Sequence, residues 1–148
     1  MFAIVGKDIM KSFPATLENL YQMIQYVKDD ALAKGFDKTE FEHIEVAIEE
    51  ALVNVIHHGY KNYQGIIDIS CFSNPSQFYI VIEDNGMHHD PLSFKRVIDP
   101  KEPIETRQPG GYGVHFISEL MDEVIYERKG NKNCLTLVKS KKNSSPPS

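Results

Sequence analysis

The stretch AIEEALVNVIHHGY (residues 47–60) decides the fold of this chain more than any other. Its apolar residues recur three and four positions apart, which predicts an amphipathic helix. Glu50 and Asn54 are four residues apart within it, so the helix places an acid and an amide one above the other on one stripe. An acid and an amide are unusual on a packing face, and Asn is a poor residue for a helix interior. This stripe therefore indicates a site as well as a helix.

The ends of this helix, and a second helix before it, follow from neighbouring residues. Thr39 and Glu42 form a Thr-x-x-Glu capping-box pattern, which predicts that the helix opens there, and Gly59 is expected to close it. An earlier helix is predicted to end at Gly35. Its apolar residues recur at helical spacing: Leu17, Leu20, Tyr21, Ile24, Val27, Ala31 and Leu32.

Strand patterns surround the two helices. Strands are predicted, weakly for the first, at 2–13, 65–73, 77–84, 123–129 and 133–140. Turn residues at 73–76 separate the strands at 65–73 and 77–84, and Gly130-Asn131 separates the last two strands. A long loop is expected over 87–113 and a third helix over 113–121. This order predicts an α+β fold, a two-layer α/β sandwich with helices on one face of a mixed, mostly antiparallel sheet.

Composition limits the class of protein. The 148 residues fit a single domain over 1–140, with a disordered Lys/Ser/Pro tail over 141–148. The net charge of −5 argues against a nucleic-acid-binding surface. No apolar run reaches the roughly 18 residues of a membrane span, and no signal peptide is recognisable. Cys71 and Cys134 are expected to be buried thiols, so a cytoplasmic protein without membrane contact is predicted.

The amide of the 47–60 helix suits the role of a metal ligand, and its carboxylate suits the role of a general base. The oxygen of an Asn side chain is a hard, neutral ligand of the kind Mg²⁺ accepts. A carboxylate one helical turn away can take a proton from a hydroxyl. The alternative is an exposed acidic helix with a solvated Asn54.

The stretch IVIEDNG (80–86) ends an apolar strand with Asp84 and Gly86. Both faces of this strand are largely apolar, which predicts a central strand of the sheet. A carboxylate at its end can accept a hydrogen bond from the amino group of adenine, whereas guanine presents an oxygen there. The alternative is a plain turn, because Asp-Asn-Gly is a common turn sequence.

The third stretch, PGGYGVHFISELMDEV (109–124), runs from a glycine-rich turn into a helix. Gly110, Gly111 and Gly113 would let the backbone approach a phosphate closely at the helix N-terminus. The alternative is a bare hinge. In the loop before it, Arg107 is a candidate for closing on a γ-phosphate.

The histidines give no strong metal signal. His57, His58 and His115 lack a cysteine or carboxylate that would complete a zinc set, and capping or solvated roles are expected for them. His88 is expected to lie in a loop near the nucleotide.

In order and spacing, these three stretches resemble the N, G1 and G2 boxes of the GHKL ATPase superfamily, and within it the bacterial anti-sigma-factor serine kinases. The resemblance spans roughly residues 8–140. It implies that Asn54 holds Mg²⁺, that Glu50 is the base, and that Asp84 contacts the adenine of ATP. Thr136 matches a Thr that reaches adenine through water. The family pattern is Asp-x-Gly-x-Gly, and this chain departs from it because His88 stands at the position of the second glycine.

The resemblance also implies a function. Such proteins bind Mg²⁺–ATP, hold a sigma factor away from RNA polymerase and phosphorylate a serine of a small anti-sigma-factor antagonist, usually as homodimers. The alternative from the sequence is an ATP-gated regulatory binding module without kinase activity.

Overall fold

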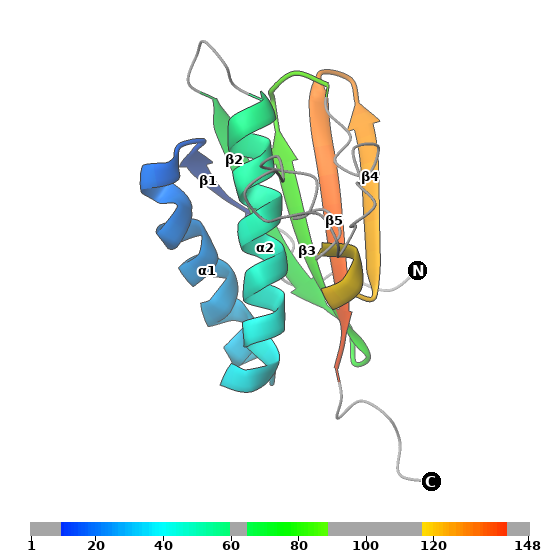
Figure 1. Cartoon of the computed structure of the whole chain (residues 1–148). Helices are drawn as coiled ribbons and strands as arrows, with labels where there is room; N and C mark the ends of the chain where they lie inside the picture. The colour runs from blue at the N-terminus through cyan, green and yellow to red at the C-terminus, as the bar shows by residue number, and fades with distance from the viewer. Residues whose placement is uncertain (1–9, 60–64, 89–116, 142–148) are drawn as a thin grey trace, which may run out of the picture.

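Five strands form one sheet, and two helices cover one face of it (Figure 1). The computed structural model describes residues 10–59, 65–88 and 117–141. The strands are β1 (Met10–Pro14), β2 (Ile66–Ser73), β3 (Gln77–Asp84), β4 (Glu123–Lys129) and β5 (Lys132–Ser140). A short 3₁₀ turn, η1 (Leu17–Asn19), leads into α1 (Leu20–Ala33), and α2 (Lys38–Gly59) follows. A further helical turn covers residues 117–120.

The strand order is β1-β2-β3-β5-β4, so β3 is the central strand, as its two apolar faces predict. Each of the four pairings between these strands is antiparallel. The α+β class with helices on one face of the sheet is confirmed. The expected strand at 2–13 is described only from Met10, and it continues to Pro14.

The core lies between the helices and the sheet. Alternate residues of β3 are buried against the helices, namely Phe78, Ile80 and Ile82. The apolar stripe of α2 packs in the same core and includes Ile44, Ile48 and Leu52. Because side chains alternate across a strand, Asp84 continues the helix-facing row of β3. The sheet thus carries a buried carboxylate at the end of an apolar row.

The capping box of α2 differs from the predicted one. The Asp37 carboxylate accepts a hydrogen bond from the Glu40 backbone N–H at 2.7 Å, and Glu40 Oε1 accepts one from the Asp37 N–H at 3.1 Å. These reciprocal bonds make Asp37 the N-cap and Glu40 the third helical residue. The prediction from Thr39 and Glu42 was wrong because an equivalent pair begins two residues earlier.

Gly35 ends α1 as predicted. Its φ is +104°, a conformation that glycine adopts without strain. The Gly35 N–H bonds the Leu32 carbonyl at 3.2 Å, and the Phe36 N–H bonds the Ala31 carbonyl at 3.1 Å. This pair of bonds is a Schellman motif, and Phe36 and Ala31 both lie in the core.

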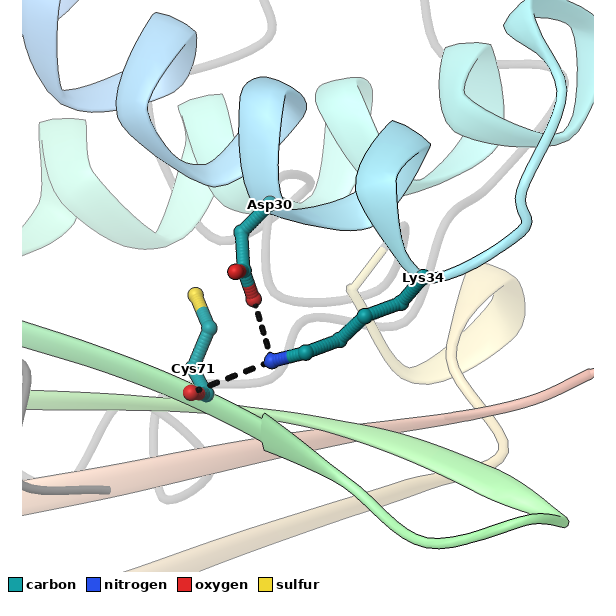
Figure 2. Close-up of polar contacts among 3 residues, drawn as sticks. All are labelled: Asp30, Lys34 and Cys71. Atoms are coloured by element: carbon teal, nitrogen blue, oxygen red, sulfur yellow. Dashed lines mark hydrogen bonds and ion pairs between the residues drawn. The ribbon is translucent and has the colours of Figure 1, made fainter. Parts of the chain in front are cut away.

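A lysine fixes the last turn of α1 on the sheet (Figure 2). Lys34 Nζ lies 2.7 Å from the Asp30 carboxylate and donates to the Cys71 carbonyl of β2 at 3.5 Å. Cys71 and Cys134 are both free and buried, as predicted. Burial raises the pKa of the Cys71 thiol to about 12, so this thiol stays protonated at neutral pH.

Two predicted turns are confirmed. Asn74 Oδ1 accepts hydrogen bonds from the N–H groups of Ser76 and Gln77, both at 2.8 Å. Gly130, at a φ of +60°, takes the first place of a two-residue hairpin between β4 and β5. In the described part of the chain, no helix is both long and apolar enough to span a bilayer.

Candidate functional site

The candidate residues of α2 and β3 lie toward the same end of the sandwich. α2 ends at Gly59, β2 begins at Ile66, and Ile67 of β2 pairs with Asp84 of β3. The C-terminal ends of α2 and β3 therefore lie at one end of the sheet (Figure 1). The structure brings the stripe with Glu50 and Asn54 and the strand end with Asp84 toward a common region.

Asn54 is buried in α2 with an incomplete set of hydrogen bonds. Its side chain is 9% exposed, and no described residue provides a partner for its Nδ2. Leaving a buried polar group unpaired costs about 1–3 kcal/mol, so native proteins keep few of them. The unpaired NH₂ group is a donor, so it is free to bond an acceptor that the described residues do not supply, such as a water or a ligand oxygen. A solvated surface Asn, the alternative from the sequence, does not describe this residue.

Glu50 lies one helical turn before Asn54 and is half-buried. Burial raises the pKa of its carboxyl group, and the neighbouring charge of Glu49 raises it further. Glu49 itself is exposed. A raised pKa makes the Glu50 carboxylate a stronger base than a solvated glutamate, which suits proton removal from a hydroxyl.

Asp84 is 4% exposed at the end of β3. Its Oδ1 accepts a hydrogen bond from the Gly86 N–H at 2.8 Å and one from Asn133 Nδ2 at 3.0 Å. The first bond is that of an Asx turn, so the turn that the sequence allowed is present. The same bonds hold a buried carboxylate in a fixed orientation, which a contact to a ligand also requires.

Three residues that the sequence analysis missed form a hydrogen-bonded row that reaches Asp84 through Asn133. Asn133 of β5 pairs with Asp84 in register, and Arg128 of β4 pairs with Asn133. Arg128 and Tyr126 both donate to Asn133 Oδ1, at 3.1 and 2.5 Å. One signal was available in the sequence: Asn133 shares its face of β5 with the buried Leu135 and Leu137, so it is a polar residue on the core side of a strand.

Thr136 does not join Asp84. It pairs with Val81 of β3 and Ile125 of β4, three residues along β5 from Asn133. An odd separation puts two residues on opposite faces of a strand, so Thr136 lies on the face away from the helices. Asn133, which the sequence analysis did not single out, is the residue of β5 that bonds Asp84, and the water-mediated contact of Thr136 to adenine stays a prediction.

The remaining candidates divide into two groups. Arg107, Gly110, Gly111 and Gly113 lie outside the described residues, as does His115. His88 is exposed next to the Asp84 turn, with its ring centroid 6.0 Å from that of Tyr126 and the planes 27° apart. His57 is exposed. Within residues 10–59, 65–88 and 117–141, no group of three His, Cys, Asp or Glu side chains is placed to hold a metal ion.

Comparison with known proteins gives the family. A family model described as the histidine kinase-like ATPase domain matches residues 13–139. That match covers well over half of the sequence, and the chain belongs to the histidine kinase-like ATPase domain family. This two-layer fold is thus the fold of a member of an ATPase family.

Within this family, the chain is similar to proteins named serine-protein kinase RsbW. Serine-protein kinase RsbW of Bacillus thuringiensis (strain Al Hakam) is 32% identical over 93 residues, which make up 61% of this chain and 58% of that protein. Serine-protein kinase RsbW of Oceanobacillus iheyensis is 34% identical over 94 residues, which are 61% of this chain and 60% of that one. The matches therefore span less than two thirds of either relative.

A solved structure shares the fold. The crystal structure of the RsbU and RsbW domains of Rv1364c from Mycobacterium tuberculosis matches with a TM-score of 0.58 at 14% identity. The match covers 89% of this chain and 33% of that one. At this identity the likeness supports the fold alone.

Proposed function

We propose that this protein is an ATP-dependent serine kinase that also acts as an anti-sigma factor. The observation that carries the proposal is the placement of a half-buried Glu50 with a raised pKa one helical turn before the buried Asn54, on one stripe of α2. The similarity to proteins named serine-protein kinase RsbW supports it. The partners are a sigma factor and a small antagonist protein, the working form is a homodimer, and the location is the cytoplasm.

Each described residue has one role in the proposed site. The side-chain oxygen of Asn54 would ligate Mg²⁺, a role that suits its neutral, hard oxygen. When bound, the metal would neutralise charge on the phosphoryl group that is transferred. Asp84, held by Gly86 and Asn133, would accept a hydrogen bond from the amino group of adenine.

For the residues outside the described ranges, the proposal uses the roles expected in the sequence analysis. The backbone of Gly110, Gly111 and Gly113 would bind phosphate oxygens, and Arg107 would contact the γ-phosphate.

In the proposed reaction, a serine hydroxyl of the antagonist attacks the γ-phosphorus of ATP. The new bond joins the serine oxygen to phosphorus, and the bond between phosphorus and the β,γ-bridging oxygen breaks, which releases ADP. The carboxylate of Glu50 takes the hydroxyl proton. Its raised pKa favours this step because the group binds the proton more tightly than a solvated glutamate does.

The test is transfer of label from γ-labelled ATP to a small antagonist protein from the same cell. Glu50→Gln keeps the shape of the side chain and removes the base, so transfer should fall about 10²–10⁴-fold. ATP and sigma-factor binding should persist. Glu49→Gln is the matched control, because it removes the exposed neighbouring acid; its rate should stay close to that of the wild type.

A second function, an ATP-gated binding module without kinase activity, is favoured by one observation. His88 stands exposed beside Tyr126, at the position where the family pattern has its second glycine. ATP-dependent sigma-factor binding with no transfer in the wild type would support this module against the kinase.

A further inference from the structure

A row of polar side chains crosses three neighbouring strands where β3 ends. Asp84 of β3 lies opposite Asn133 of β5, and Asn133 lies opposite Arg128 of β4. Tyr126 is two residues before Arg128, so it lies on the same face of β4. All four residues are on the face that the helices cover.

Asn133 is the centre of this row, and its whole hydrogen-bonding capacity is engaged. Its Nδ2 donates to Asp84 Oδ1 at 3.0 Å and to the Met87 carbonyl at 2.8 Å. Its Oδ1 accepts from Tyr126 Oη at 2.5 Å and from Arg128 Nη1 at 3.1 Å. A primary amide has two hydrogens and one oxygen with two lone pairs, so these four bonds use all of them.

Arg128 and the two acceptors of the NH₂ group, Asp84 and Met87, agree on the way the amide of Asn133 faces. A guanidinium group only donates, so the atom of Asn133 that faces it must be the oxygen. The NH₂ group is then directed to Asp84. Arg128 Nη1 also donates to the Gly86 carbonyl at 3.1 Å, and its Nε donates to the Gly130 carbonyl at 3.2 Å. One side chain therefore holds the Asn133 amide, the Asp84–Gly86 turn and the β4–β5 hairpin together.

We propose that Arg128 and Tyr126 are positioning residues that set the preference of this site for a purine with a 6-amino group. They act through Asn133, which holds the Asp84 carboxylate and its turn in one geometry. This inference rests on the proposed binding of an adenine nucleotide. Without Arg128 the Asn133 oxygen loses its charged donor and the Asp84–Gly86 turn loses its bond to the Gly86 carbonyl, so the carboxylate is held less firmly in the geometry that faces the base.

The experiment compares two nucleotides by isothermal titration. ATP and purine riboside 5′-triphosphate differ only in the 6-amino group, so the ratio of their Kd values reports the contact with that group. Wild type should favour ATP. Arg128→Ala should lower this preference about tenfold, because hydrogen bonds to a charged group are being misaligned. It should change the Kd for purine riboside triphosphate much less.

Matched variants separate positioning from charge and packing. Lys129→Ala removes a cation from the same strand on the opposite face, and its nucleotide ratio should equal that of the wild type. Tyr126→Phe removes only the hydroxyl and should lower the ratio by a smaller factor. Tyr79→Phe removes a hydroxyl that bonds Gln77 on the other face, and it should leave the ratio unchanged.

A double variant tests whether the effect passes through Asp84. Asp84→Asn should itself abolish most of the preference for ATP. In that background Arg128→Ala should produce no further change in the ratio, because both substitutions remove the same contact. A full additional loss would mean that Arg128 acts on the base by another route and would overturn the proposal.

The outcomes distinguish this inference from the function on which it rests. If wild type binds neither nucleotide, the proposed function fails and the inference fails with it. If wild type prefers ATP and a natively folded Arg128→Ala keeps that preference, the inference alone fails. If Arg128→Ala does not fold by circular dichroism, Tyr126→Phe decides, and an unchanged ratio there overturns the proposal.

Discussion

Asn54 carries a cost that none of the described residues offsets. Its unpaired, buried Nδ2 disfavours the folded state, and Asn is a weaker helix former than Ala. Asn54→Ala should therefore raise the free energy of unfolding of the nucleotide-free protein, by about 0.5–2 kcal/mol. The same variant should lose Mg²⁺-dependent ATP binding. Urea unfolding and titration with Mg²⁺–ATP measure the two effects.

The control for this prediction is Val46→Ala, an exposed position on the same helix. It should leave both the stability and the nucleotide affinity close to wild type. A destabilised Asn54→Ala that still binds Mg²⁺–ATP as before would show that the amide is an ordinary structural residue.

Glu50 makes stability depend on pH in a definite direction. Burial raises its pKa in the folded state above the ordinary value of 4.5, so the folded protein binds this proton more tightly than the unfolded chain. The resulting stabilisation is fully present below the unfolded pKa and is lost as the pH rises through the folded pKa. Compared with Glu50→Gln, the wild type should therefore lose stability as the pH rises from 4 to 8.

Urea unfolding of both proteins across this range measures the difference. Glu49→Gln should weaken the trend, because the charge of Glu49 is the second cause of the raised pKa. A difference that stays constant with pH, or grows in the opposite sense, would contradict the burial of Glu50.

The sequence alone predicts that two residues lie close together when they are near each other along the chain. Glu50 and Asn54 are four positions apart on one helix, so their common stripe follows from helical geometry alone. Asn133, Arg128 and Tyr126 were missed because they reach Asp84 only through the pairing of β3 with β5 and of β5 with β4. The face of β5 on which Thr136 lies likewise depends on the pairing of β5 with its neighbours.

Among the elements, α2 gives the sharpest test of a local signal. The reciprocal bonds of Asp37 and Glu40 cap this helix, and Thr39 lies exposed inside its first turn. Asp37→Ala should lower the free energy of unfolding by about 0.5–2 kcal/mol, as the loss of an N-cap does. Thermal or urea unfolding measures it. Thr39→Ala is the control, and equal losses in the two variants would mean that Asp37 is not the cap.

The positions of most elements were predictable, and their ends were less so. Gly35, Asn74 and Gly130 mark turns by their own conformational preferences, and the structure confirms all three. The start of α2 was ambiguous because Asp37-x-x-Glu40 and Thr39-x-x-Glu42 both satisfy the capping pattern. The reciprocal hydrogen bonds of Asp37 and Glu40 show which of the two pairs caps the helix.

For the molecule as a whole, the order of the strands was the part that the sequence left open. Hairpin signals predict that β2 pairs with β3 and that β4 pairs with β5. They do not predict that β5, rather than β4, lies beside β3. That choice places Asn133 opposite Asp84 and completes the polar row at the end of the sheet. The most specific part of the site thus depends on the least local part of the fold.

The insertion of β5 between β3 and β4 has a consequence during synthesis on the ribosome. β5 follows the other four strands in the sequence, yet it occupies an interior place in the sheet. A nascent chain that ends before residue 132 exposes the edge of β3 and lacks Asn133, the β5 residue that pairs with Asp84. Translation must therefore deliver β5 before Asn133 can bond this carboxylate, and until then the polar row at the end of the sheet is incomplete.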